Sequence, residues 1–305
     1  MNAAVPPRAL LLLVVLTLVW GTNWPLFPLA TREVSVWTFR AVALMIAGPT
    51  LLLVARLKGY PLAVDRRHWG TLAAATLCYL LIWNIASTYA AILIPSGQAA
   101  ILGFTMPLWL ALVSWAVLGQ RMTGRTLLAI ALGGGAVALL MWDGMDAYAK
   151  APLGFMLGLL AGLGWAIGTL IIKRQPINSP AIVTTGWQLL GAAVPTALVA
   201  LVLGQGHWFW PSWTSIAVIG YIALVPMCIG NAAWFAIVGL LPAQVAGLSS
   251  IAVPIVAMVS GAWVHGEPLG PLQWGAMACC VGGLWLALGA PQAPRAPAAA
   301  APRSD

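Results

Sequence analysis

Ten apolar runs of about 20 residues follow one another along this 305-residue chain. Each run is long enough to cross a hydrocarbon core of about 30 Å as an α-helix. Only 7% of the residues are charged and 62% are hydrophobic, whereas a soluble domain carries about 25% charged residues. The sequence therefore predicts an all-α integral membrane protein, and it lacks the strand alternation of an outer-membrane barrel.

The predicted transmembrane helices are residues 9–29, 34–56, 69–90, 95–118, 123–142, 152–172, 180–204, 212–238, 242–264 and 269–289. A short lead, residues 1–8, precedes them, and a Pro/Ala-rich tail, residues 290–305, is predicted to be disordered. The first run continues to Leu29 without a small-residue cleavage site, so we expect a retained helix and not a signal peptide.

The stretch 84–139 is present twice in the chain, without insertion or deletion between its anchors. Adding 147 to the numbering matches Asn84 with Asn231, Pro95 with Pro242, Pro107 with Pro254 and Gly119 with Gly266. Each copy holds five spans, and because five is odd, the second copy must enter the membrane upside down. We therefore predict two inverted five-helix repeats, residues 9–142 and 152–289, joined by an external linker, residues 143–151.

The distribution of Lys and Arg predicts the orientation. With the N-terminus inside, the inner segments carry eleven basic residues, whereas the outer segments carry only Arg32 and Lys150. This bias places both termini in the cytoplasm and the chain in a bacterial-type inner membrane. The net charge of +8 is thus a topology signal, since the basic residues form no patch with interleaved aromatic residues that would suit a nucleic acid.

Several short motifs resemble one known family. The residues Trp20-Gly21-Thr22-Asn23 resemble the start of the EamA-type domain of the drug/metabolite transporter superfamily. The other matching pieces, in order, are Arg40 in helix two, Trp165-Ala166 with Lys173-Arg174 in the second copy, and the endings Pro107 to Gly119 and Pro254 to Gly266-Glu267. One departure is Gln120-Arg121, where the family often has Glu.

Within that superfamily, the Trp abundance and the chain length are most similar to the YddG-type exporters of aromatic and other neutral amino acids. The resemblance implies alternating access, with substrate held between helices one to four and six to nine. It also implies that helices five and ten are more peripheral.

Catalytic chemistry is poorly supported by this sequence, and we expect no enzyme activity, metal site or cofactor. The acidic residues are Glu33, Asp65, Asp143, Asp146, Glu267 and Asp305, which all lie at span ends, in loops or in the tail. Proton-driven transporters usually keep a titratable group within the membrane. The missing mid-depth carboxylate therefore favours facilitated diffusion or exchange of a net-neutral solute.

A neutral amino acid needs a donor for its carboxylate, an acceptor for its ammonium group and an apolar wall for its side chain. Arg40 is the only charged residue away from the ends of a predicted span, although it could instead snorkel to the interface or cap its helix there. The predicted substrate-binding residues are Trp20, Asn23, Arg40, Tyr79, Trp83, Gln98, Trp165, Thr169, Trp187, Gln244 and Ser249.

Two matched pairs of residues have either a structural or a functional interpretation. Pro107 and Pro254 fall in mid-span, where each would kink its helix and free a carbonyl four residues earlier, at Gly103 in the first copy. These three residues are candidate hinges. Asn84 and Asn231 are predicted to form hydrogen bonds between helices.

The sequence as a whole predicts a carrier that exports small neutral metabolites, most of all aromatic and other neutral amino acids. The alternatives are a broad exporter of drugs or cationic amphiphiles, or else a membrane pore or scaffold. The expected partners are a small-molecule substrate and the lipid bilayer, with no nucleic acid, and the chain is expected to be a monomer.

Overall fold

The computed structural model describes residues 6–117, 119, 122–203, 211–241, 246, 250–266 and 269–288. The described part of the chain is helical and contains no strand, in agreement with the all-α prediction. The elements are α1 (Pro7–Gly21), α2 (Leu26–Ala30), α3 (Val36–Leu57), η1 (Arg66–His68), α4 (Trp69–Ala75), η2 (Thr76–Ile82), α5 (Trp83–Leu93), α6 (Ser96–Gly103), α7 (Met106–Ala116), α8 (Gly124–Asp143), α9 (Met145–Lys150), α10 (Pro152–Arg174), α11 (Ala181–Leu203), α12 (Trp213–Ile222), η3 (Ala223–Gly230), α13 (Asn231–Leu240), η4 (Ser250–Ala252), α15 (Val253–His265) and α16 (Pro271–Leu288).

Six stretches of the described chain are long and apolar enough to cross a membrane. They are Val36–Leu57, Arg66–Leu93, Ser96–Ala116, Pro152–Arg174, Ala181–Leu203 and Trp213–Leu240. Shorter apolar helices lie at Pro7–Gly21, Gly124–Leu139 and Val253–His265. The predicted external linker contains a short helix, α9, that the sequence did not indicate.

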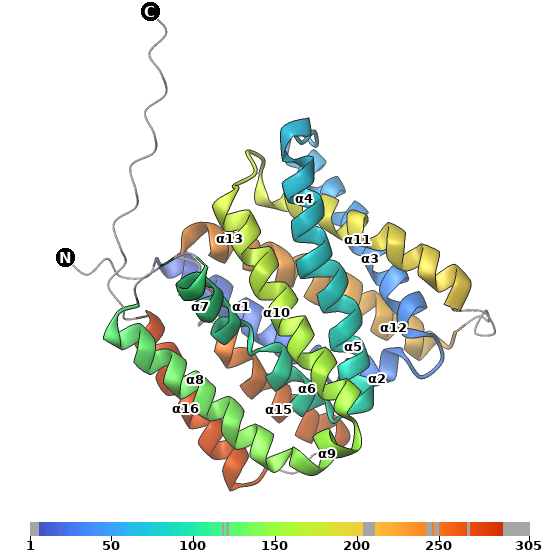
Figure 1. Cartoon of the computed structure of the whole chain (residues 1–305). Coiled ribbons are helices and arrows are strands. Elements are labelled where there is room, and N and C mark those ends of the chain that lie inside the picture. Colours follow the sequence, from blue (N-terminus) through green and yellow to red (C-terminus); the bar gives the residue numbers. More distant parts are fainter. Residues whose placement is uncertain are drawn as a thin grey trace, which may run out of the picture.

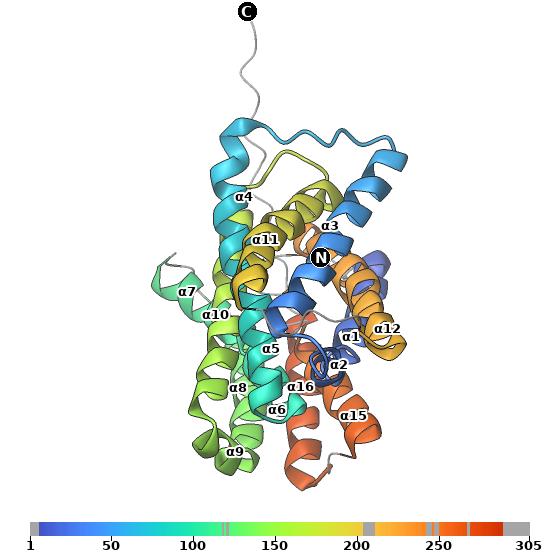
Figure 2. The same ribbon diagram turned by 90° about the vertical axis from the view of Figure 1, so that its right-hand side faces the viewer.

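The two halves of the chain are interlocked in one bundle (Figures 1 and 2). In the first half α1 packs against α13 and α15 of the second half, and in the second half α10 packs against α5 and α6 of the first. Helix α3 lies along α11, and α8 lies along α16 on the flank of the bundle (Figure 1). The first helix of each half thus contacts the third and fourth helical regions of the other.

The first predicted helix, residues 9–29, is broken in the structure into α1 and α2. The break falls at residues 22–25, where Pro25 supplies no amide hydrogen and cannot continue the ladder of α1. The fourth predicted helix is likewise broken at Phe104 and Thr105, between α6 and α7. Residues 22–25 and Phe104 are next to the cavity described below.

Pro107 and Pro254 differ from the mid-helix kinks that the sequence suggested. Each lies in the first turn of a new helix, Pro107 in α7 and Pro254 in α15. An amide hydrogen is not needed for the helical ladder there, so proline fits without strain. The interruption of the backbone precedes each proline and is not a bend around it.

Two π-helical segments, η2 and η3, begin 147 residues apart, at Thr76 and Ala223. The duplication therefore extends to an unusual backbone geometry, and each segment is followed by one member of the matched pair, Asn84 and Asn231. Single π-helical turns within α-helices are rare and frequently lie at functional sites.

Glycine permits the close crossing of α3 and α11. A Cβ atom built on Gly48 would lie 2.8 Å from Leu190 Cγ, 3.0 Å from the Leu190 backbone nitrogen and 3.2 Å from the carbonyl oxygen of Gly186. Two of these three neighbours are backbone atoms, which no rotamer change can move. A side chain at position 48 must therefore push the two helices apart.

We expect Gly48→Ala to destabilise the protein by about 1–3 kcal/mol, the usual cost of overpacking. The matched control is Gly134→Ala in α8, where a built Cβ meets no atom within 4 Å. The control should be neutral or slightly stabilising, because alanine restricts the unfolded chain. Thermal unfolding in detergent, followed by size-exclusion chromatography, measures both. Equal unfolding temperatures for the two variants would contradict this account of the crossing.

Candidate functional site

The centre of the bundle is an aromatic cluster around Trp165 of α10, whose side chain is 0% exposed. Its ring centroid lies 4.7 Å from Trp83, 5.0 Å from Trp234, 5.2 Å from Trp20 and 5.4 Å from Phe104. Most of these pairs are edge-to-face, the geometry that the charge distribution of aromatic rings favours. Rings from both halves of the chain therefore meet at one residue. We call these five residues the aromatic cluster.

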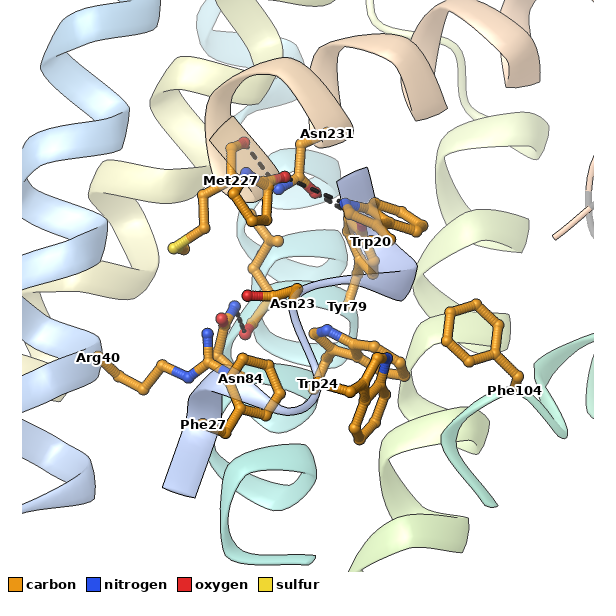
Figure 3. Close-up of a pocket in the computed structure, with 13 residues that line it drawn as sticks. Trp20, Asn23, Trp24, Phe27, Arg40, Tyr79, Asn84, Phe104, Met227 and Asn231 are labelled. Carbon is orange, nitrogen blue, oxygen red and sulfur yellow. Dashed lines mark hydrogen bonds between the residues drawn. The ribbon is translucent and has the colours of Figure 1, made fainter. Parts of the chain in front are cut away.

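A small cavity lies beside the aromatic cluster (Figure 3). It is lined by Trp20, Asn23, Trp24, Phe27, Arg40, Tyr79, Leu80, Trp83, Asn84, Phe104, Pro226, Met227 and Asn231. Its free volume is about 30 Å³, which is room for water, whereas pockets that hold small ligands measure about 300–1,000 Å³. Most of the lining side chains are buried, so in this conformation the cavity is small and lies largely inside the protein.

Arg40 reaches the cavity from α3 and is 2% exposed. Its Nε donates a hydrogen bond of 2.6 Å to Thr88 Oγ1, and that hydroxyl donates to the carbonyl of Asn84 at 2.7 Å. The guanidinium carbon lies 4.3 Å from the ring centroid of Phe27 and 4.7 Å from that of Phe39. These contacts hold the side chain inside the protein, which excludes the snorkelling interpretation.

The charge of Arg40 has no counter-charge in the described part of the chain. The ion pair recorded there joins Arg67 to Asp65 on the exposed surface, and the residues that line the cavity include no Asp or Glu. Arg40 Nη2 is buried and finds no hydrogen-bond partner among the described residues. A buried, unpaired cation is costly, so this position is suited to an anionic group such as a carboxylate.

Tyr79 and the matched asparagines form the polar wall of the cavity. Tyr79 OH donates to Asn231 Oδ1 at 2.7 Å, which joins η2 to α13. The Nδ2 atoms of Asn84 and Asn231 donate to the carbonyls of Leu80 and Met227, four residues earlier in each case. The predicted interhelical bond is therefore made by Asn231 alone, and both side chains otherwise cap their own π-helical segments.

Two further polar groups complete this wall. Trp20 Nε1 donates to the carbonyl of Pro226 at 3.0 Å, which ties α1 to η3. Asn23 Oδ1, in the break between α1 and α2, is buried and has no partner among the described residues. Figure 3 shows Arg40 and Phe104 at opposite sides of the lining, with Asn23 and Tyr79 between them. The cavity thus has a cationic end at Arg40, where Phe27 also lies, and an opposite end at Phe104 of the aromatic cluster.

Five of the predicted substrate-binding residues line the cavity, beside the matched pair Asn84 and Asn231. The five are Trp20, Asn23, Arg40, Tyr79 and Trp83. Trp165 lies behind them in the aromatic cluster, and Thr169, one helical turn further along α10, is buried with its hydroxyl unpaired among the described residues. Gln244 and Ser249 lie outside the described residues.

The structure places two other candidates away from the cavity. Gln98 lies at the start of α6 against Gly144, and Trp187 Nε1 donates to the carbonyl of Leu62 at 2.8 Å on the flank of the bundle. The candidate hinge Gly103 does not line the cavity but lies beside it, since a Cβ atom built there would be 3.1 Å from both Trp24 and Trp83. Its carbonyl oxygen faces α10, 2.9 Å from a Cβ atom built on Gly162.

The predicted substrate-binding residues do not include Trp24, Phe27, Phe104 or Thr88. Trp24 and Phe27 are brought to the cavity by the break in the first helix, which a continuous helix from 9 to 29 conceals. The proximity of Pro25 and Pro28 was the available signal for that break. Thr88 follows Asn84 at helical spacing, so both side chains share one face of α5.

We expect Tyr79→Phe to destabilise the protein by about 1–3 kcal/mol, because it leaves the buried Asn231 Oδ1 without its donor. The control is Tyr89→Phe, since Tyr89 lies half-buried against Trp37 and its hydroxyl forms no hydrogen bond with the residues that the structure describes. Chemical or thermal unfolding of the purified variants gives both values. An unchanged Tyr79→Phe variant would mean that this bond carries little of the contact between the halves.

Comparisons with known proteins agree with this architecture. A family model described as the EamA-like transporter family matches residues 7–142 and again residues 152–289. A protein of Escherichia coli (strain K12) named probable amino-acid metabolite efflux pump is 25% identical over 284 residues, which cover 90% of this chain and 93% of that protein. Another, named uncharacterized inner membrane transporter YedA, is 26% identical over 275 residues, 88% of this chain and 87% of that protein.

A solved crystal structure shares the fold, with a TM-score of 0.74 and 20% sequence identity, over 92% of this chain and 96% of its own. The two family matches cover almost the whole sequence, one on each side of α9. The family is one of membrane transporters, and the motifs at Trp20 and Trp165 each fall within one of the matched halves. The chain therefore belongs to the EamA-like transporter family of the drug/metabolite transporter superfamily, with its domain present twice.

Proposed function

We propose that this transporter exports neutral amino acids and prefers those with aromatic side chains. The observation that carries the proposal is Arg40, a buried cation without a described counter-charge at one end of an aromatic-lined cavity. A guanidinium group binds a carboxylate through paired N–H donors. The substrate's carboxylate would take that position, and its side chain would lie toward Phe104 and the aromatic cluster.

The same charge argues against a carrier of drugs or cationic amphiphiles. A cationic substrate would meet Arg40 across a cavity whose lining includes no carboxylate, and like charges in a low-dielectric site repel strongly. A neutral amino acid brings both an anionic and a cationic group. Asn23 Oδ1, buried and unpaired among the described residues, is a suitable acceptor for its ammonium group. The name of the relative that is a probable amino-acid metabolite efflux pump supports this substrate class.

We also propose that the membrane architecture is ten spans in two inverted repeats of five. The repeats are residues 9–142 and 152–289, with both termini in the cytoplasm and the chain acting as a monomer in the inner membrane. The reciprocal packing of α1 and α10 supports an exchange symmetry between the halves. The bias of Lys and Arg toward one side supports the orientation.

Transport in this proposal requires the small central cavity to enlarge alternately toward each side. The breaks just before Pro107 and Pro254 and the break at residues 22–25 interrupt the helical backbone where the halves can rock. On one side of the bundle Glu33 Oε2 accepts from the Ser212 backbone nitrogen at 2.8 Å. On the other, Thr71 donates to Gln175 at 2.6 Å. Both contacts join the two halves, and in this mechanism they would open in turn.

The test is counterflow in proteoliposomes loaded with unlabelled Phe, Trp, Thr or Met, following the uptake of labelled Phe. We expect trans-stimulated uptake that saturates, as a carrier requires. Arg40→Gln should weaken apparent Phe affinity about 10- to 100-fold, because a hydrogen bond to a charged group contributes about 1.5–3 kcal/mol. Arg32→Gln, an exposed Arg to Gln change in the loop after α2, is the matched control and should behave as wild type.

An imposed pH gradient should not drive Phe accumulation, because no acidic group lines the cavity. No exchange with any amino acid would overturn the substrate assignment. A cationic dye can be tested as a competing substrate. If the dye is taken up and inhibits Phe uptake to the same extent in wild type and in Arg40→Gln, the drug-exporter alternative is favoured.

A further inference from the structure

A second hollow of the described structure is much larger than the central cavity. A groove of about 820 Å³ runs between the α4–η2 helix and α11, on the flank of the bundle. Its lining includes Arg66, Leu77 and Leu81 on one side and Trp187, Gly191 and Val194 on the other. In Figure 2 the connection between α3 and α4 passes over one end of these helices. All but two of the lining side chains are apolar.

The groove has the length of an acyl chain. Arg66 and Leu81 are 15 residues apart on one helical stretch, or roughly 20 Å at 1.5 Å per residue. Half of a hydrocarbon core is about 15 Å, which is the depth that one lipid tail occupies. Leu77 and Val194, in the walls of the groove, are more than half exposed. Gly191 leaves space between α11 and η2, because a Cβ atom built on it would lie 3.4 Å from Thr76 Cγ2, an ordinary van der Waals distance.

The roof of the groove is fixed by two tryptophan indoles. Trp187 Nε1 donates to the carbonyl of Leu62 at 2.8 Å, and Trp69 Nε1 donates to the carbonyl of Val64 at 3.0 Å. The loop above the groove is therefore held in place by both walls. This gives a preformed site and not a chance gap between helices.

The mouth of the groove carries a positive charge that is available to a ligand. Asp65 pairs with Arg67 at 3.1 Å, and the exposed Arg66, which lines the groove, forms no ion pair in the part of the chain that the structure describes. The ligand that fits is therefore amphipathic, with an apolar tail and an anionic head. On the proposed topology this mouth faces the cytoplasmic leaflet, where anionic lipids attract juxtamembrane basic residues.

We infer that this groove binds an anionic phospholipid of the inner leaflet, with an acyl chain between η2 and α11 and the phosphate at Arg66. The site is distinct from the central cavity but shares η2 with it. Thr76, Leu77 and Leu81 face the groove, whereas Tyr79 and Leu80 line the cavity. A bound acyl chain thus braces the outer face of the segment that presents Tyr79. The leaflet assignment rests on the proposed topology, but binding itself does not depend on transport.

The test is native mass spectrometry of the full chain with equimolar phosphatidylglycerol and phosphatidylethanolamine that carry identical acyl chains. We expect phosphatidylglycerol adducts to dominate in wild type. Arg66→Gln should reduce them about fivefold, the contribution of one basic residue near a lipid surface. The matched control is Arg56→Gln, an exposed position near the same end of the bundle that does not line the groove.

A second variant tests the tail. Gly191→Leu fills the groove and should reduce the adducts of both lipids, and Val194→Phe, at an exposed groove position, serves if Gly191→Leu does not fold.

Equal phosphatidylglycerol binding by wild type and Arg66→Gln would overturn the headgroup site. If Arg66→Gln and Arg56→Gln lose phosphatidylglycerol adducts to the same extent, the preference for this lipid comes from general surface charge and not from the groove. Adducts that survive filling of the groove would overturn the site altogether. Lipid binding without amino-acid counterflow would refute the proposed function and leave this inference intact.

Discussion

The buried guanidinium group of Arg40 is the interaction on which the centre of this molecule depends. Taking a cation out of water is unfavourable unless it is paired or hydrogen-bonded, and Arg40 is held by one hydroxyl and two aromatic rings without a described carboxylate. The aromatic faces and the Thr88 acceptor offset part of that cost. What remains is an attraction for any anionic group that enters. Charged residues are rare within membranes and are usually functional there, so we interpret Arg40 as a functional residue.

The irregular backbone of the fold is concentrated around this charge. Residues 22–25, Phe104, η2 and η3 all border the cavity, while α3, α10 and α11 are long and continuous. Non-helical backbone is tolerated at membrane depth only where protein or a cavity, and not lipid, surrounds it. The π-helical segments η2 and η3 begin 147 residues apart, which indicates that both halves use the same backbone geometry to orient side chains toward the cavity. The continuous helices provide the frame, and the interrupted ones provide the site.

The sequence was sufficient for the class, the duplication and a part of the cavity. Arg40 is identifiable because it is the only charged residue away from the ends of a predicted span, and Tyr79 and Trp83 because helical spacing puts them on one face. Periodicity cannot say which apolar face meets which helix, so Trp187 was assigned to the substrate although it holds the roof of the lateral groove. That arrangement follows from the close crossing of α3 and α11 at Gly48, a long-range contact that no local pattern encodes.

The small size of the cavity bears on the choice of substrate. A volume of about 30 Å³ cannot hold an amino acid, so the rings around Trp165 must separate before one enters. Each aromatic pair lost in that opening gives up about 0.5–1.5 kcal/mol. A ligand shifts such an equilibrium only by binding the opened state better. A substrate with an aromatic side chain restores ring contacts as it enters, while its carboxylate meets Arg40. A small aliphatic amino acid satisfies only the second requirement, which is the physical basis for an aromatic preference in this site.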